Sequence, residues 1–218
     1  MRVASFFEEN KHWSRGLVWL CGLDEVGRGP LAGPVVACAL VFDSRHKDFK
    51  LIQKAEFRDS KLFSQKQREK LFDFLINSEA VKYSVSFVSE RIIDKINILQ
   101  ASQLAMRQAL QALKIVPDFL LIDGRDTLSG YPCSQKAIIK GDEKIASIAA
   151  ASVVAKVLRD RKMQEYHERY PRYGFDRHKG YGTRQHLGAI VKHGPCPIHR
   201  MSFAPLKKID KLFEGAIL

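Results

Sequence analysis

Short apolar runs and one alternating stretch divide the chain into candidate strands. Residues 17–23 and 35–42 are almost continuously apolar, which is typical of strands that are buried on both faces. Residues 81–88 alternate between apolar and polar positions, as expected of a half-buried strand. Residues 118–122 form another apolar run, and residues 137–139 are a candidate fifth strand. The pattern therefore predicts a sheet of five short strands.

Helical spacing of apolar positions predicts four helices, over residues 64–75, 97–114, 144–169 and 184–193. The first begins with a capping box formed by Ser64 and Gln67. The third starts with small apolar residues and ends highly charged. The early strands lack intervening helices, whereas the later ones alternate with them. We therefore expect an α/β fold in which helices flank a mixed sheet.

The charge balance favours a polyanionic partner. The chain has 36 Lys and Arg against 24 Asp and Glu, which gives a formal charge of +12. Residues 156–200 hold 11 of those cations, five of the seven histidines and four of the six tyrosines. Aromatic rings between cations suit nucleic acid, because rings contact sugars and bases while cations contact phosphates. An anionic membrane, or no polyanion at all, is the alternative.

The remaining composition indicates a cytosolic protein. No apolar run approaches the ~18–20 residues that span a bilayer, and the N-terminal apolar stretch is too short for a signal peptide. No two cysteines form a CxxC pair, so a zinc site is not expected. We expect no membrane partner and reduced cysteines, at Cys21, Cys38, Cys133 and Cys196.

Four acidic residues stand where strands end or helices begin, namely Asp24, Glu25, Asp123 and Asp142. Carboxylates that gather at one site repel each other, and a divalent cation removes that conflict. Mg²⁺ and Mn²⁺ prefer hard oxygen ligands. Two such ions about 3.5–4 Å apart can activate a water molecule and stabilise the leaving oxygen of a phosphodiester. The basic surface would then hold the substrate that the acidic centre cuts.

Local geometry sets a condition on this hypothesis. Adjacent strand residues point to opposite faces, so Asp24 and Glu25 can share one metal site only if the strand ends or bulges there. Gly27 and Gly29 are compatible with such a break. The alternative is that the aspartates are ordinary turn or capping residues.

Several ordered blocks of the chain resemble bacterial ribonuclease HII. The opening block is GLDEVGRGPLAGPV at residues 22–35, which contains the DExGRG pattern. The others are DSK at 59–61, LIDG at 121–124, KGD at 140–142, AAASVVAKVLRD at 149–160, HKGYGT at 178–183 and HRMSF at 199–203. Together the blocks cover roughly residues 18–206, in family order.

The resemblance implies an RNase H-like fold, with a five-stranded mixed β-sheet flanked by helices and a C-terminal helical portion. Residues 1–16 would be an N-terminal extension, and residues 17–218 a single catalytic domain in which 160–218 bind substrate. The implied activity is hydrolysis of the RNA strand of RNA–DNA hybrids. Duplex DNA would also be nicked on the 5′ side of embedded ribonucleotides, giving 3′-hydroxyl and 5′-phosphate ends.

Specific roles follow from the same resemblance. The four acidic residues would be catalytic and would bind Mn²⁺ or Mg²⁺. Gly27, Arg28 and Gly29 would present backbone groups to the ribose 2′-hydroxyl, and Tyr181 would lie against the sugar. Ser60 and Lys61 would contact the phosphate backbone. Gly182 stands where many relatives have proline, which should loosen that turn slightly.

The C-terminal end of the chain bears on its expected partners. The chain ends soon after the last block and shows no clamp-binding peptide, and we expect a monomer that takes part in DNA replication and repair. A ribonuclease HIII would carry threonine in place of Arg28 and an extra N-terminal domain. Another nuclease of the superfamily would act on a different nucleic acid. A non-catalytic binding protein of the same fold would be expected to lose at least one carboxylate. A dinucleotide-binding reading of residues 27–29 fails, because the third glycine is missing.

Overall fold

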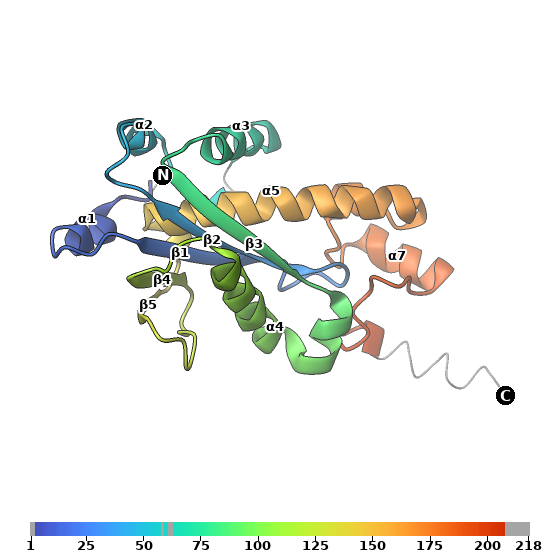
Figure 1. Cartoon of the computed structure of the whole chain (residues 1–218). Coiled ribbons are helices and arrows are strands. Elements are labelled where there is room, and N and C mark those ends of the chain that lie inside the picture. Colours follow the sequence, from blue (N-terminus) through green and yellow to red (C-terminus); the bar gives the residue numbers. More distant parts are fainter. Residues whose placement is uncertain (1–2, 58, 61–62, 208–218) are drawn as a thin grey trace. The chain divides into compact units, whose positions relative to one another are not determined.

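The structure is a computed structural model that describes residues 3–57, 59–60 and 63–207 (Figure 1). Its chain forms two compact units. The first comprises Met1–Val26, Val36–Ser86 and Ala105–Val157, and the second comprises Gly27–Val35, Phe87–Leu104 and Leu158–Leu218. Both units draw on segments that are distant in sequence, so long-range packing rather than chain order defines them.

A five-stranded mixed sheet organises the first unit (Figure 1). Its strands are β1 (Leu20–Val26), β2 (Val35–Phe42), β3 (Val81–Val88), β4 (Phe119–Asp123) and β5 (Ser134–Ile138). They lie in the order β3-β2-β1-β4-β5. β1 pairs antiparallel with β2 and parallel with β4, which in turn pairs parallel with β5. The predicted mixed five-stranded sheet is confirmed.

Three strands differ from their predicted bounds, and β4 does so only by starting and ending one residue later than residues 118–122. β1 does not end at residue 23 but continues through Asp24 and Glu25 to Val26, which pairs with Val36. Its polar residues interrupt the apolar run, so the sequence pattern hides the continued ladder. β5 begins three residues earlier than expected and ends one residue earlier. Its alternating polar residues likewise resemble a loop until they pair with β4.

Seven α-helices are described, four of which correspond to predicted ones. They are α1 (Phe7–Trp13), α2 (Phe49–Lys54), α3 (Gln65–Ile76), α4 (Glu90–Ala112), α5 (Ala146–Arg169), α6 (Phe175–His178) and α7 (Arg184–His193). The capping box before α3 is confirmed, because Ser64 and Gln67 each accept a backbone N–H from the other. α1, α2 and α6 were not predicted, since short helices carry little periodicity. No described helix is long and apolar enough to span a membrane.

α4 contains a sharp break at Asn97, where φ is 65°. The Asn97 side chain accepts hydrogen bonds from the backbone N–H groups of Leu99 and Gln100, at 3.0 and 3.1 Å. It therefore caps a new helical segment. The predicted start at residue 97 corresponds to this second segment, whereas the preceding turns were missed.

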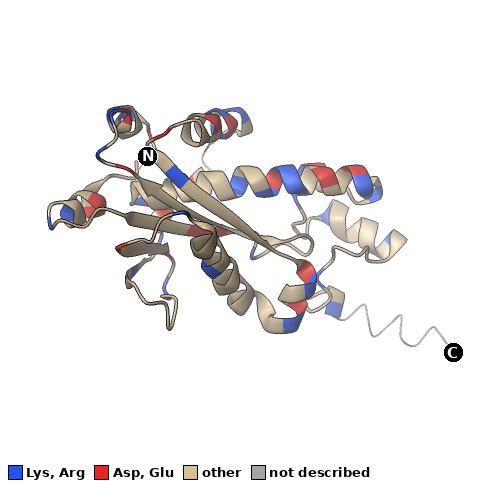
Figure 2. Cartoon of the chain, viewed as in Figure 1, with Lys and Arg blue, Asp and Glu red and all other residues tan. Residues whose placement is uncertain are grey.

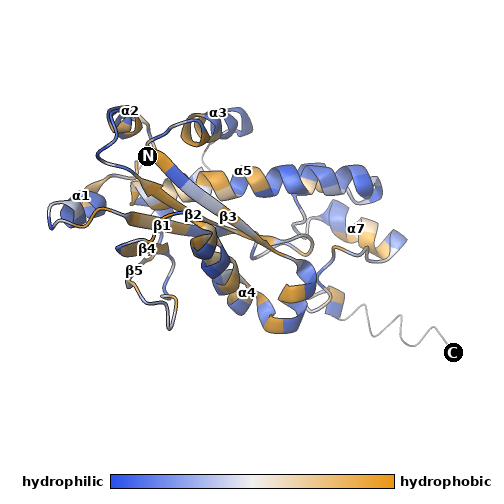
Figure 3. Cartoon of the chain, in the orientation of Figure 1, coloured by the Kyte–Doolittle hydropathy of each residue, from blue (hydrophilic) through white to orange (hydrophobic). Residues whose placement is uncertain are grey.

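The first turns of α5 pack unusually close to β1. A Cβ atom at Gly22 would lie 2.3 Å from the backbone carbon of Ser147, so only glycine fits there. The following residues, 148–151, are fully buried, and Figure 3 shows α5 changing from hydrophobic to hydrophilic along its length. The small residues at the start of α5 therefore allow its backbone to approach β1 closely.

The N-terminal residues fasten the start of α5. Glu9 is fully buried and accepts the backbone N–H of Ser147 at 2.8 Å. Ser5 exchanges backbone hydrogen bonds with Lys144 and Ala146, at 3.0 and 3.1 Å. A carboxylate at a helix N-terminus satisfies amides that have no partner within the helix. Residues 5–9 therefore hold the turn that precedes α5, which carries Asp142.

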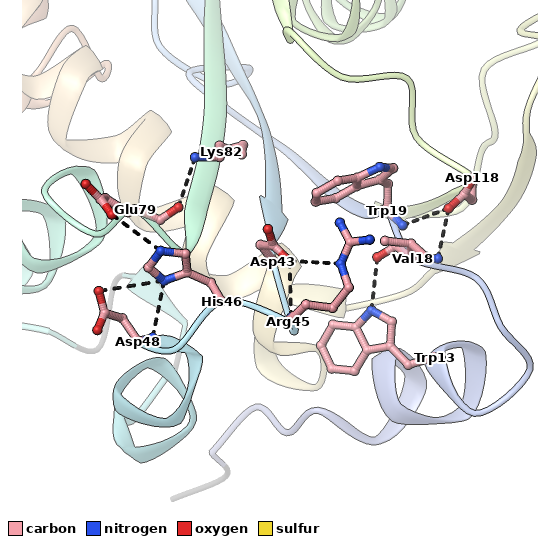
Figure 4. A network of polar contacts seen from close by, with 10 residues as sticks. All are labelled: Trp13, Val18, Trp19, Asp43, Arg45, His46, Asp48, Glu79, Lys82 and Asp118. Carbon is pink, nitrogen blue, oxygen red and sulfur yellow. Dashed lines mark hydrogen bonds and ion pairs between the residues drawn. The ribbon is translucent and has the colours of Figure 1, made fainter.

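Polar contacts also hold the segment that leads into β1 (Figure 4). The Asp118 carboxylate accepts the backbone N–H groups of Val18 and Trp19, at 2.9 and 2.8 Å. The Trp13 indole donates to the Val18 carbonyl at 3.3 Å, and the Arg45 guanidinium lies 4.7 Å from the centre of the Trp19 ring. These contacts fix β1 beside the start of β4.

The second unit has its own apolar core. Its buried members are Leu31, Ala32, Met163, Tyr173, Phe175, Ile190, Cys196, Ile198 and Leu206. They come from the loop after β1, the second half of α5 and the segments around α6 and α7. This core explains how residues so distant in sequence form one compact body.

Candidate active site

Asp24 lies in the middle of the sheet. It occupies β1 opposite Cys38 of β2, and it is only 5% exposed. One of its carboxylate oxygens accepts the backbone N–H of Glu25 at 2.7 Å. In the parallel pairing of β1 with β4, Leu23 faces Ile122. Asp24 and Asp123 are therefore the next residues on neighbouring strands.

Asp123 ends β4 and binds the turn that contains Asp142. Its carboxylate oxygen Oδ1 accepts the backbone N–H of Gly141 at 2.6 Å. A Cβ atom at Gly141 would lie 2.6 Å from the side chain of Ile148, so the turn needs glycine to come this close. Asp142 follows in a short 3₁₀ helix and is 8% exposed. One hydrogen bond thus ties Asp123 to Gly141, the residue that directly precedes Asp142.

Electrostatic interactions link all four predicted carboxylates, which we call the carboxylate cluster: Asp24, Glu25, Asp123 and Asp142. Burial raises the pKa of the Asp24 carboxyl well above its usual range, and the negative charges of Glu25 and Asp123 raise it further. A hydrogen bond from Ser152 acts in the opposite direction, and Asp142 adds a smaller increase. The cluster therefore concentrates negative charge in a buried position, where it is costly.

The donor set fits a divalent cation. All four side chains offer hard carboxylate oxygens, which Mg²⁺ and Mn²⁺ prefer, and a cation would offset the repulsion that raises the pKa of Asp24. Among the described residues, no group of three or more His, Cys, Asp and Glu side chains is arranged so that it could hold a metal ion. Mg²⁺ usually keeps several water ligands and takes oxygens from a phosphate substrate, so an incomplete protein set suits it.

Asp24 and Glu25 could share one metal site only if β1 ended or bulged at these residues. β1 neither ends nor bulges at Asp24 and Glu25, since its pairing with β2 continues to Val26. The Glu25 charge nevertheless acts on Asp24 more strongly than any other charge does. The condition of a strand end or bulge is therefore not met, and the electrostatic interaction of Glu25 with Asp24 is what links the two carboxylates.

Ser152 is a polar residue of the site that the sequence did not reveal. It lies in α5, is 6% exposed and hydrogen-bonds to Asp24. Its hydroxyl also lies 3.1 Å from that of Ser60, which is 3% exposed. Contact of Ser60 with a phosphate stays a prediction, and Lys61 lies outside the described residues. Within the small-residue run 149–155, nothing in the spacing distinguishes Ser152 from its neighbours.

In the second unit, residues 27–34 form a loop that we call the glycine loop. Gly27 is buried with φ of 93°, a conformation that favours glycine. A Cβ atom there would lie 2.2 Å from Nε of Arg159. Arg28 and Gly29 are exposed. The loop therefore offers two exposed residues on a buried glycine support.

Two fully buried arginines bind the carbonyl groups of the glycine loop. The Arg200 guanidinium donates to the carbonyls of Gly27, Arg28 and Gly33, at 2.6, 3.0 and 2.8 Å. The Arg159 guanidinium donates to those of Ala32, Pro34 and Lys179, at 3.2, 3.0 and 3.1 Å. Burial lowers the pKa of Arg159 to about 10 and that of Arg200 to about 9. The sequence pattern alone indicates no role for either arginine.

Tyr181 lies beside the exposed tip of the glycine loop. Its side chain is 45% exposed, and a ring carbon lies 3.7 Å from where a Cβ atom of Gly29 would be. The carbonyl of the preceding residue, Gly180, accepts the backbone N–H of Leu31 at 2.8 Å. The structure therefore brings together the predicted sugar-contacting tyrosine and the predicted glycine turn.

The second unit also carries much of the basic charge. Figure 2 shows Lys, Arg, Asp and Glu along the second half of α5. Among them, Lys162 pairs with Glu165 at 2.6 Å and lies 5.3 Å from the centre of the Tyr166 ring. Cations and tyrosines thus lie side by side here, as the composition of residues 156–200 predicted.

Comparison with known proteins identifies the family. A family model described as Ribonuclease HII matches residues 21–206. A ribonuclease HII from Chlamydia caviae is 51% identical over 205 residues, covering 94% of this chain and 92% of that protein. One from Caldicellulosiruptor bescii is 48% identical over 209 residues, covering 95% of this chain and 97% of that protein.

Solved structures agree with the sequence comparison. The crystal structure of ribonuclease H2 from Pyrococcus horikoshii matches with a TM-score of 0.74 and 29% identity, covering 90% of this chain and 99% of that chain. The expected RNase H-like fold is therefore confirmed, with its mixed sheet and flanking helices. By sequence and by fold, the chain belongs to the ribonuclease HII family, whose members are metal-dependent endoribonucleases.

Proposed function

We propose that this ribonuclease nicks duplex DNA on the 5′ side of an embedded ribonucleotide, in addition to hydrolysing the RNA strand of hybrids. The observation that carries the proposal is the carboxylate cluster, in which three neighbouring charges act on the buried Asp24. Two divalent ions held by these side chains would supply an activated water and stabilise the leaving oxygen. The products would carry 3′-hydroxyl and 5′-phosphate ends.

The chain's own residues set the geometry of that reaction. Asp24 and Asp123 hold fixed positions on adjacent strands, and the bond from Gly141 to Asp123 keeps the Asp142 turn beside them. Ser152 favours the ionised form of Asp24, which is the form that binds a cation. Pre-positioned oxygens avoid reorganisation during turnover.

Recognition of the ribose is assigned to the glycine loop and Tyr181. Arg200 binds the carbonyls of Gly27 and Arg28. In a trans peptide, the N–H of the next residue points opposite to the carbonyl. The amides of Arg28 and Gly29 therefore point away from Arg200, and we assign them to the 2′-hydroxyl and its phosphate. The Tyr181 ring beside Gly29 would lie against the sugar.

Other assignments remain predictions on the same basis. We propose that residues 160–218 form the substrate-binding portion, because they include Tyr181 and the basic second half of α5. A monomeric state, a cytosolic location and the use of Mn²⁺ or Mg²⁺ are also predictions. The expectation that no clamp-binding peptide is present concerns residues 208–218, which lie outside the described residues.

A cleavage assay tests the proposal. Duplex DNA with a single ribonucleotide is compared with the identical all-DNA duplex, with Mn²⁺, with Mg²⁺ and with chelator. We expect one cut on the 5′ side of the ribonucleotide, only with metal, and none in the all-DNA control. Equal cutting of both duplexes, or cutting in chelator, would overturn the assignment.

A further inference from the structure

Three buried histidines of the second unit meet beneath the turn that carries Tyr181. We call His178, His186 and His199 the histidine chain; they are 9%, 0% and 2% exposed. The rings of His178 and His186 stack with centres 4.5 Å apart, and Nε2 of His186 lies 3.0 Å from Nε2 of His199. The spacing of these histidines along the sequence gives no sign of this arrangement.

Backbone contacts determine which nitrogen of His178 carries the proton. The peptide N–H of Gly180 points at Nδ1 of His178, at 3.2 Å, and a peptide N–H can only donate. Nδ1 therefore accepts, and in a neutral ring the proton sits on Nε2. That nitrogen lies 2.7 Å from the Tyr173 carbonyl, which can only accept. The two contacts agree on one neutral form.

The same reasoning determines which nitrogen carries the proton in His199 and His186. The peptide N–H of Cys196 donates to Nδ1 of His199 at 2.8 Å, so the His199 proton sits on Nε2 and points at His186. The Cys196 carbonyl also lies near Nδ1, at 3.1 Å, but one nitrogen cannot donate there while it accepts the peptide N–H. Nε2 of His186 then accepts from His199.

The remaining proton of His186 reaches Tyr181. Because Nε2 of His186 accepts, its proton sits on Nδ1, which lies 3.0 Å from the Tyr181 carbonyl. Burial lowers the pKa of both His186 and His199 to about 4, so both rings are neutral at pH 7. Every ring proton then has an acceptor, and the bonds through His199 and His186 run in one direction, from Cys196 to Tyr181.

This arrangement suits neither metal binding nor substrate contact. Both nitrogens of each ring are already engaged by protein groups. In the described part of the chain, no set of three metal-binding side chains includes them. With so little exposed surface, the rings cannot reach a phosphate. What they do contact is the backbone of the turn, at Tyr173, Gly180 and Tyr181.

We propose that His186 and His199 are positioning residues, which set the orientation of the Tyr181 backbone and thereby of its exposed ring against the substrate sugar. The inference rests on the proposed function, which places Tyr181 at the ribose. The turn needs such a support, because Lys179 and Gly180 both have positive φ, of 50° and 89°. A fixed carbonyl at Tyr181 limits how far the ring can move from Gly29.

Two substitutions of His186 separate its two nitrogens. The Asn side-chain amide lies near the position of Nδ1, so His186→Asn keeps a donor for the Tyr181 carbonyl and loses the contact with His199. The longer Gln side chain reaches the position of Nε2, so His186→Gln keeps that contact and loses the donor. His193→Gln, at an exposed position on the same helix, is the matched control.

The readout is steady-state cleavage of the single-ribonucleotide duplex. We expect His186→Gln to lower kcat about tenfold with KM changed less than about twofold, because phosphate contacts elsewhere dominate affinity. His186→Asn should lower kcat only about twofold, and His193→Gln should match the parent. Equal losses in the Asn and Gln variants would overturn the proposal, since a merely structural role does not depend on which nitrogen is kept.

A double substitution tests whether the effect passes through Tyr181. If it does, adding His186→Gln to Tyr181→Ala should lower kcat no further, because the ring to be positioned is already gone. Multiplicative losses would overturn the positioning role. The parent protein's discrimination between ribonucleotide and all-DNA duplexes is measured in the same series. Loss of that discrimination would reject the proposed function, whereas additive losses with discrimination intact would reject only this inference.

Imidazole nitrogen NMR of the parent protein at pH 7 requires no variant to fold. We expect a neutral ring protonated on Nδ1 for His186, and neutral rings protonated on Nε2 for His178 and His199. A His186 ring protonated on Nε2, or on both nitrogens, would contradict the direction of the chain and overturn the proposal.

Discussion

The carboxylate cluster of the first unit and the glycine loop of the second unit both involve buried charge, with opposite physical consequences. Around Asp24, like charges lie close together and raise its pKa. Around Arg200, the charged group donates to three loop carbonyls and is thereby satisfied. In the first region, repulsion between carboxylates destabilises the fold and a cation can relieve it, whereas in the second region the loop depends on the hydrogen bonds of the guanidinium. Replacing the charged side chain should therefore have opposite effects on the free energy of unfolding in the two regions.

The largest effect is expected from removing a metal ligand. Asp123→Asn should lower turnover by about 10²–10³-fold or more with little loss of hybrid binding, because the carboxylates act on charge that develops in the transition state. Single-turnover cleavage with Mn²⁺ and binding in chelator measure the two quantities. Asp126→Asn, at a neighbouring exposed aspartate, serves as the control and should leave both unchanged.

The next effect concerns the support of the glycine loop. Arg200→Lys should lower the free energy of unfolding by about 2–3 kcal/mol, since a single ammonium cannot bind three carbonyls as the planar guanidinium does. Denaturant melts measure the change. The exposed Arg172→Lys provides the comparison and should differ from the parent by less than about 0.5 kcal/mol. Equal melts for the two variants would show that the loop does not depend on Arg200.

A pH effect should follow from the histidine chain. The pKa values of His186 and His199 are lowered to about 4 in the folded state from the ordinary 6.5, chiefly by burial and also by the neighbouring His178. Between these values the unfolded chain binds protons that the folded chain excludes. Stability should therefore fall as pH drops from 6.5 towards 4. Over this range the unfolded chain comes to bind about two more protons than the folded chain.

Melts of the parent and of His199→Asn across this pH range check that effect. The variant lacks one of the two histidines whose pKa is lowered to about 4, so its stability should depend less steeply on pH than that of the parent. A parent slope unchanged by His199→Asn would mean that this histidine does not contribute.

The smallest effect is also the most direct test of the comparison. Asp24→Asn keeps an oxygen for the Glu25 amide and removes the charge that three neighbours oppose. In chelator, the variant should be more stable than the parent by about 1 kcal/mol. Added Mn²⁺ should stabilise the parent more than the variant, by mass action. Thermal melts with and without Mn²⁺ measure both differences, and a less stable variant in chelator would contradict the comparison.

Local pattern was sufficient for much of the fold. The strands at 35–42 and 81–88 and the helix at 184–193 have the predicted bounds, and the capping box opens α3 as expected. Periodicity and capping are short-range properties, so they can be read from neighbouring residues. The end of β1 could not, because pairing with β2 carries it through two acidic residues.

The residues of the site also fall into those that the sequence reveals and those that only the folded structure reveals. The four carboxylates and the glycine turn stand out in the linear sequence, since their residue types and their places at strand ends suggest chemistry. Ser152, Arg159, Arg200 and the histidine chain do not, because each acquires its role from backbone groups that are distant along the chain. Hydrogen-bond partners of this kind exist only once the chain has folded. Residue identity therefore shows which groups can do chemistry, whereas packing selects the buried polar groups that hold them in place.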